Sequence, residues 1–213
     1  MRNTNFFDTL ISEVDNALRT LLPPETRIGT RSSPATEIKD NPLSAKEKRH
    51  VAGLMRVNHA GEVCAQALYQ GQALTAQLTH IKKQMSDAAA EEVDHLAWCE
   101  TRLHELGSKP SRLNPIWYGG SIVLGALAGC AGDKVSLGFV AETERQVTAH
   151  LRHHLQKLPT NDKKSQAILA QMQEDEEQHA DAAVAAGAIE LPYPMKQLMG
   201  TVSKLMTKSS YYI

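Results

Sequence analysis

The sequence predicts an all-α protein, an antiparallel four-helix bundle with an additional amphipathic helix at each end of the chain. Two observations support this fold class. From about residue 46 onward, apolar residues recur with a helical period, and the alternation of β-branched residues typical of strands is nearly absent. The breaks between the long helical segments are short, so consecutive helices are expected to lie antiparallel.

An amphipathic helix is expected at the start of the chain, over residues 4–22. Its apolar side chains follow helical spacing: Phe6, Phe7, Leu10, Ile11, Val14, Leu18 and Leu21. Pro23 and Pro24 end this helix, and the stretch from there to Pro42 is rich in Pro, Ser, Thr and charge without an apolar period. We therefore assign residues 1–45 to an N-terminal helix and a Pro-rich linker.

Four long helices are predicted next, with breaks at Gly107 to Pro115 and at Leu158 to Asp162. They cover residues 46–78, 81–106, 121–157 and 163–187. The bundle is assigned to residues 46–191 and a basic amphipathic helix to residues 192–213. Such a terminal helix can lie in a membrane interface, cap the bundle or contact a partner chain.

The composition excludes some function classes. The chain has 213 residues, 42% of them hydrophobic, which suits one domain with a buried core. Its 23 basic and 24 acidic residues give a net charge of −1, so we expect no nucleic-acid partner. Cys64, Cys99 and Cys130 lack the close pairing of a disulfide framework, and no signal peptide is recognisable, so a reducing, cytoplasmic location is expected.

The most apolar stretch, Ile116 to Gly132, is too short and too rich in glycine to be read as a membrane-spanning helix. Two interpretations remain open for it. It can contact a bilayer surface or line an apolar pocket, or its small residues can pack between helices.

Two predicted helices each carry a Glu and a His three residues apart, Glu92 with His95 and Glu176 with His179. At this spacing both side chains point to one helix face. Each pair lies within an apolar stripe, and a buried carboxylate costs several kcal/mol unless its charge is compensated. Glu47 and His50 match the same spacing, and we interpret them as a chance match.

Each of these helices follows another that also buries one Glu. Glu62 precedes Glu92 by 30 residues, and Glu144 precedes Glu176 by 32, which indicates an internal repeat of two helical hairpins. Glu142 competes with Glu144, but it lies about 200° away around the helix at ~100° per residue. Because residue 144 shares a face with apolar neighbours, we choose Glu144.

Six residues are therefore predicted to bind two metal ions: Glu62, Glu92, His95, Glu144, Glu176 and His179. Four carboxylates carry a charge of −4, which two divalent ions neutralise. Mixed oxygen and imidazole ligands suit iron or manganese, and this pattern is typical of ferritin-like di-metal proteins. Glu91 and Asp175 can accept the ring N–H of a ligand His or be exposed to solvent, and His150 is a further candidate partner.

At RVNHAGE (56–62), EEVDH (91–95), AETERQVTAH (141–150) and EDEEQH (174–179), the chain resembles the Coq7 family of demethoxyubiquinone hydroxylases over roughly residues 46–208. The resemblance implies a di-iron monooxygenase of ubiquinone biosynthesis with two iron ions per subunit. It would hydroxylate the ring of 2-polyprenyl-3-methyl-6-methoxy-1,4-benzoquinol with O2, using a reductant that the sequence does not identify.

The resemblance also implies which residues bind each ion and where the protein is located in the cell. Glu62, Glu92 and His95 would hold one iron, and Glu144, Glu176 and His179 the other, with some glutamates bridging. The protein would attach peripherally to the cytoplasmic face of the cell membrane, through the segment at 116–132, and other quinone-biosynthesis proteins are candidate partners. The rival interpretations are a ferritin-class ferroxidase, a di-iron hydroxylase acting on a tRNA base, and a metal-free interaction bundle.

Overall fold

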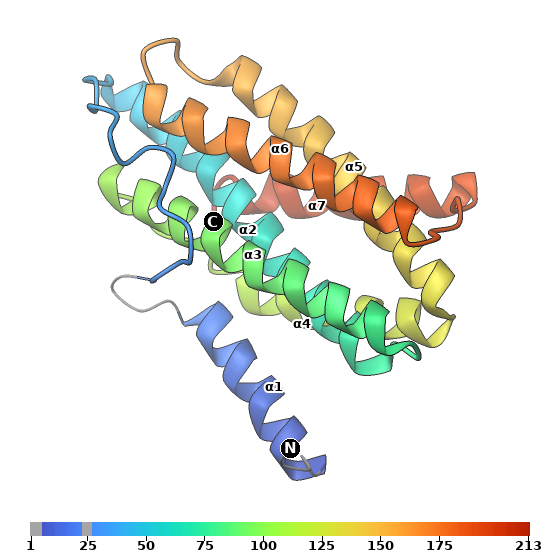
Figure 1. Ribbon diagram of the computed structural model, residues 1–213. Coiled ribbons are helices and arrows are strands. Elements are labelled where there is room, and N and C mark those ends of the chain that lie inside the picture. Colours follow the sequence, from blue (N-terminus) through green and yellow to red (C-terminus); the bar gives the residue numbers. More distant parts are fainter. Residues whose placement is uncertain (1–5, 23–26) are drawn as a thin grey trace.

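The structure, a computed structural model, describes residues 6–22 and 27–213, and every regular element in these residues is a helix (Figure 1). This confirms the all-α prediction. The helices are α1 Phe6–Leu21, α2 Ala45–Thr75, α3 Thr79–Glu105, α4 Asn114–Cys130, α5 Asp133–Lys157, α6 Lys163–Ala185 and α7 Tyr193–Ser210. Residues 4 and 5 of the predicted first helix, and Pro23 and Pro24 after it, lie outside the described residues.

Helices α2, α3, α5 and α6 form the bundle, in which α2 packs on α3 and α5 packs on α6 (Figure 1). Two clusters of buried apolar side chains hold these helices together. One contains Met55, Leu103, Leu151 and Leu169, one residue from each helix. The other contains Tyr69, Met85, Val140 and Ala183, again one from each. The predicted metal ligands lie between the two clusters along every helix of the bundle.

The start of α2 explains the third Glu–His match. Ser44 and Glu47 form a capping box, in which the Ser44 N–H donates to the Glu47 carboxylate at 2.8 Å and the Glu47 N–H donates to Ser44 Oγ at 3.3 Å. His50 contacts the Tyr211 hydroxyl at 2.7 Å. Both side chains thus have local structural roles, in agreement with a chance match.

The prediction of one helix over 121–157 is wrong, because the chain turns after Cys130 and divides this stretch between α4 and α5. Gly132 has a φ of 109°, a left-handed conformation that favours glycine. Asp133 then accepts the backbone N–H groups of Gln77 and Leu78 at 3.0 and 2.8 Å. The apolar period did not reveal this break because both flanking segments are helical.

Helix α4 packs on α2 at close range through glycine. A Cβ atom at Gly71 would overlap the carbonyl oxygen of Ile122, and one at Gly125 would overlap the carbonyl oxygen of Leu68. Of the two interpretations left open for this segment, the packing of small residues between helices therefore holds on one face of α4. The opposite face is apolar and exposed, with Leu127 62% accessible to solvent. No helix among the described residues is long and apolar enough to cross a membrane.

Residues 27–44, here called the N-terminal strap, run beside α3 without regular structure (Figure 1). The sequence predicted only a linker here, but ion pairs fasten it to the bundle. Arg27 pairs with Glu100 at 2.9 Å, and Asp40 pairs with the buried Arg102 at 3.2 Å. The strap therefore covers part of α3 and is held against it by these ion pairs.

Candidate metal centre

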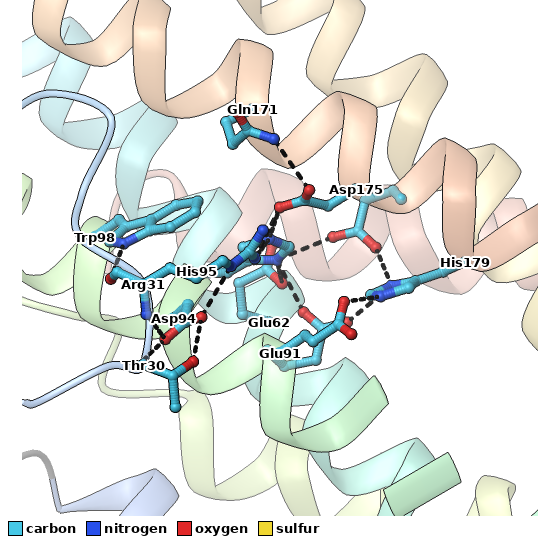
Figure 2. Close-up of polar contacts among 12 residues, drawn as sticks. Thr30, Arg31, Glu62, Glu91, Asp94, His95, Trp98, Gln171, Asp175 and His179 are labelled. Atoms are coloured by element: carbon cyan, nitrogen blue, oxygen red, sulfur yellow. Dashed lines mark hydrogen bonds and ion pairs between the residues drawn. The ribbon is translucent and has the colours of Figure 1, made fainter. Parts of the chain in front are cut away.

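The structure brings the predicted ligands together in the middle of the bundle, and Figure 2 shows Glu62, His95 and His179 among them. Helix α2 supplies Glu62, α5 supplies Glu144, and the two Glu–His pairs come from α3 and α6. Each of the four carboxylate residues is at most 2% exposed. One ligand atom from each of four residues lies within 4.8 Å of the others, in a cluster that could hold a metal ion: Glu62, Glu92, His95 and Glu176.

The carboxylates of Glu92 and Glu176 lie between the two imidazole rings. Nδ1 of His95 is 3.0 Å from Glu92 Oε2 and 3.2 Å from Glu176 Oε1. Nδ1 of His179 is 3.5 Å from Glu92 Oε1 and 3.1 Å from Glu176 Oε2. Each carboxylate thus turns one oxygen toward each ring. Of the two histidines, Glu62 lies near His95, with 3.4 Å between Glu62 Oε2 and His95 Nδ1.

Glu144 is hydrogen-bonded to a buried tyrosine. Its Oε1 accepts a hydrogen bond from the Tyr69 hydroxyl at 2.6 Å, and the Tyr69 ring stands edge-on to His179 with centroids 6.4 Å apart. Glu142, the competing choice, points elsewhere and contacts Gln146 at 2.7 Å and Lys196 at 3.5 Å. The burial of Glu144 thus agrees with the choice made from the helical wheel.

The far ring nitrogen of each histidine contacts a carboxylate from the opposite helix. His95 Nε2 of α3 is 2.8 Å from Asp175 Oδ2 of α6, and His179 Nε2 of α6 is 2.9 Å from Glu91 Oε2 of α3. Of the two alternatives left open for Glu91 and Asp175, contact with a candidate ligand His is therefore the one observed, although the Glu91 side chain is also 53% exposed. Such contacts fix the ring orientation and direct Nδ1 toward the cluster. His150 does not share this role: its buried Nε2 has no hydrogen-bond partner within the described part of the chain, and its ring centroid lies 3.9 Å from that of His154.

The electrostatics of the cluster favour a cation. Burial raises the pKa of Glu92 and of Glu144 well above the usual range, and the nearby Glu176 carboxylate raises both further. Burial alone would lower the pKa of His179, but its hydrogen bond to Glu176 and the surrounding carboxylates raise it to about 10. Negative charge is therefore costly here unless positive charge accompanies it.

These residues fit a divalent metal ion. Oε1 of Glu92 is buried and accepts no hydrogen bond, although a carboxylate oxygen in an apolar interior is normally satisfied. Carboxylate oxygens and neutral imidazole nitrogens are the donors that iron and manganese accept. A cation between the two rings would satisfy the Glu92 oxygen and neutralise the buried carboxylates.

Two cavities lie beside the cluster. One, of about 280 Å³, lies between α3, α5 and α6 and is bordered by Tyr69, Glu91, Val140 and His179. The other, of about 690 Å³, lies between α1, the strap, α2 and α3, and it also reaches Tyr69. The smaller cavity borders a candidate ligand directly.

Sequence reasoning missed the residues of the strap that reach the site. Arg31 forms ion pairs with Asp94 and Asp175, both at 2.9 Å, and Thr30 also binds Asp94 (Figure 2). No local motif marks these residues, because more than 60 positions separate the strap from its partners on α3 and α6.

A helical bundle with a buried cluster of carboxylates and imidazoles defines a ferritin-like protein whose site can hold metal ions. Comparison with known families gives the particular relationship. The chain belongs to the family described as ubiquinone biosynthesis protein COQ7, whose sequence pattern matches residues 49–210. This confirms the resemblance seen in the motifs.

Curated relatives match along their whole length. The chain is 75% identical over all 213 residues to the 3-demethoxyubiquinol 3-hydroxylase of Legionella pneumophila strain Paris. It is 59% identical, again over the full length of both chains, to the 3-demethoxyubiquinol 3-hydroxylase of Acinetobacter baylyi. Both proteins are named as hydroxylases, which supports an oxidoreductase activity for this chain.

Proposed function

We propose that the protein is a di-iron monooxygenase that hydroxylates the ring of 2-polyprenyl-3-methyl-6-methoxy-1,4-benzoquinol with O2 in ubiquinone biosynthesis. The observation that carries the proposal is the position of Glu92 and Glu176, each with one oxygen toward each imidazole. The relatives' activity, as their name gives it, is the hydroxylation of a demethoxyubiquinol.

In this proposal two iron ions per subunit are held by the six predicted residues. Glu92 and Glu176, whose carboxylates each face both rings, would be shared by the two ions, with Glu62 and His95 completing one position and Glu144 and His179 the other. The residue types fit iron because its protein sites commonly combine carboxylate oxygen with imidazole nitrogen. When bound, the irons supply the chemistry that activates O2.

The other residues orient and shield this centre. Asp175 and Glu91 accept the far N–H of His95 and His179 and thereby hold Nδ1 of each ring toward the ions. The Tyr69 hydroxyl donates to Glu144 and fixes that carboxylate. We place the approach of the quinol ring at the cavity of about 280 Å³, because it borders His179.

The reaction needs two electrons and two protons besides O2, since one oxygen atom enters the ring and the other leaves as water. Either the quinol, which would then leave as the hydroxylated quinone, or an external donor supplies these electrons. The bundle supplies a dry interior around the centre, because both apolar clusters close it from the two ends.

A lipid quinol also requires contact with a membrane. We propose that the protein attaches peripherally to the cytoplasmic face of the cell membrane through the exposed apolar side chains of α4 and α7. Val123 and Leu127 of α4 and Leu198 and Leu205 of α7 are 57–64% exposed. The two helices are neighbours, because Trp117 of α4 donates a hydrogen bond to a serine near the end of α7 at 3.0 Å. Exposed apolar patches of this kind mark interaction surfaces.

The test is quinone mass spectrometry after the purified, iron-loaded protein is incubated with the demethoxy quinol, a reductant and 18O2. We expect one labelled oxygen in the ring with the wild type and with Glu177→Gln, a matched substitution beside the site, and none with His179→Ala. An unlabelled quinol together with oxidised iron would refute the hydroxylase and favour the ferroxidase interpretation.

A further inference from the structure

Arg31, in the N-terminal strap, contacts two buried carboxylates at the edge of the candidate metal centre. Its Nε lies 2.9 Å from Asp94 Oδ2 and its Nη2 lies 2.9 Å from Asp175 Oδ2 (Figure 2). The side chains of Asp94 and Asp175 are 1% and 7% exposed, whereas that of Arg31 is 38% exposed. One guanidinium thus joins α3 to α6 from outside the bundle.

The same oxygen of Asp175 that binds Arg31 also binds a candidate iron ligand. Asp175 Oδ2 lies 2.8 Å from His95 Nε2, and Asp175 Oδ1 accepts a hydrogen bond from Gln171 at 3.1 Å. Arg31 Nη2 itself approaches His95 Nε2 to 3.5 Å. Arg31 and Gln171 therefore hold the Asp175 carboxylate between them, and this carboxylate in turn contacts the His95 ring.

The strap holds Arg31 in place through several further contacts. The Thr30 N–H and hydroxyl donate to Asp94 at 2.6 and 2.9 Å, and a Cβ atom at Gly29 would overlap Asp94 Oδ1. The guanidinium carbon of Arg31 lies 5.0 Å from the centroid of the Trp98 ring, which is a cation–π contact. These contacts distinguish Arg31 from an ordinary surface ion pair, whose two long side chains are free to separate.

We propose that Arg31 is a positioning residue of the metal centre, which acts through Asp175 to fix the ring of His95. This inference rests on the proposed di-iron centre and extends it to a part of the chain outside the bundle. The family pattern, which begins at residue 49, does not cover this part.

The arrangement is specific for one of the two metal positions. His179 binds Glu91, whose side chain is 53% exposed. Among the described residues no Arg or Lys forms an ion pair with Glu91. The loss of Arg31 should therefore affect the ion held by His95 and leave the ion held by His179 unchanged. Partners that orient a ligand typically contribute about 10- to 100-fold to metal affinity.

The test is an anaerobic titration of the full chain with Co(II), whose visible d–d bands report the ligand geometry at each position. Wild type is expected to bind two ions. Arg31→Gln should weaken one of them roughly 10-fold or more and shift its bands. Arg152→Gln, which removes the exposed pair of Arg152 with Glu177 on the other side of α6, is the matched control and should bind as wild type does.

Two further variants test the route through Asp175. In an Asp175→Asn background, Arg31→Gln should cause no additional loss of affinity, because the carboxylate that it acts on is gone. Arg31→Lys keeps the charge but cannot bridge both carboxylates as the guanidinium does. It should also weaken the His95 position, and it provides the test if Arg31→Gln does not fold.

The inference is overturned if a folded Arg31→Gln or Arg31→Lys protein binds both ions with the affinities and spectrum of wild type. It is also overturned if Arg31→Gln weakens both positions equally, or if it causes the same loss in the Asp175→Asn background. If wild type itself binds no Co(II), the metal centre is refuted and this inference with it, so the two failures can be told apart.

Discussion

Substituting Glu176 by Gln is expected to abolish binding of both metal ions, because this carboxylate faces both histidines. Its Oε1 lies 3.2 Å from His95 Nδ1 and its Oε2 lies 3.1 Å from His179 Nδ1. Gln has nearly the same shape but carries no charge, and its amide nitrogen is not a metal ligand. One bridging ligand and one of the four negative charges are lost together.

The size of the effect follows from the burial of Glu176, which is 1% exposed. With three carboxylates, two divalent ions would leave one positive charge uncompensated in a buried site. Removing one partner from a buried charge pair costs about 3–5 kcal/mol. At 1.4 kcal/mol for each factor of ten, the binding constant should fall roughly 100- to 4,000-fold.

The assay is the metal content of the purified protein by mass spectrometry after anaerobic loading with Fe(II) and desalting. Wild type and the control Glu177→Gln, an exposed neighbour on the same helix, should retain two ions per chain, and Glu176→Gln none. Glu144→Gln, which changes a residue proposed for only one position, should retain one. Two retained ions in a folded Glu176→Gln protein would refute the bridging geometry.

Three further predictions concern the packing, the pH dependence and the membrane. Gly125→Val should destabilise the fold by about 1–3 kcal/mol, because a Cβ atom at Gly125 overlaps the Leu68 carbonyl oxygen. Gly120→Val is the control. A Cβ atom at Gly120 meets no atom within 4 Å, so the melting temperature should stay nearly unchanged. Burial and nearby positive charge lower the pKa of His154 from 6.5 to about 2, so the unfolded chain binds a proton that the fold excludes. The free energy of unfolding of metal-free protein should therefore fall as the pH drops below 6.5, by at most about 1.4 kcal/mol per pH unit for this group, and His154→Gln should reduce that slope in denaturant titrations. A slope equal to that of wild type would contradict this assignment. Leu127→Glu should weaken cosedimentation with anionic lipid vesicles at least roughly tenfold, since burial of one leucine contributes about 1.5–3 kcal/mol. If the Leu127→Glu protein binds the vesicles as wild type does, α4 is excluded as the attachment site.

The helices and the six candidate ligands could be predicted because both depend on residues that lie close together along the chain. The apolar period of 3.6 residues indicates a helix wherever one face is buried, and the three-residue spacing of Glu and His places both on that face. The hairpin symmetry then aligned Glu62 with one pair and Glu144 with the other. The same local logic failed at Gly132, because only two residues, Ala131 and Gly132, separate the two helices, and both flanking segments have a helical pattern.

Only the tertiary structure decided which groups surround the ligands. Arg31 and its partner Asp175 are 144 positions apart, and nothing in the local pattern of the strap indicates that they meet. The crossed pairs of His95 with Asp175 and of His179 with Glu91 likewise depend on how α3 and α6 face each other. The sequence by itself thus determined the fold class, most of the helices and the set of candidate ligands, since periodicity and spacing are local. Their distances and partners depend on packing between segments that are remote along the chain.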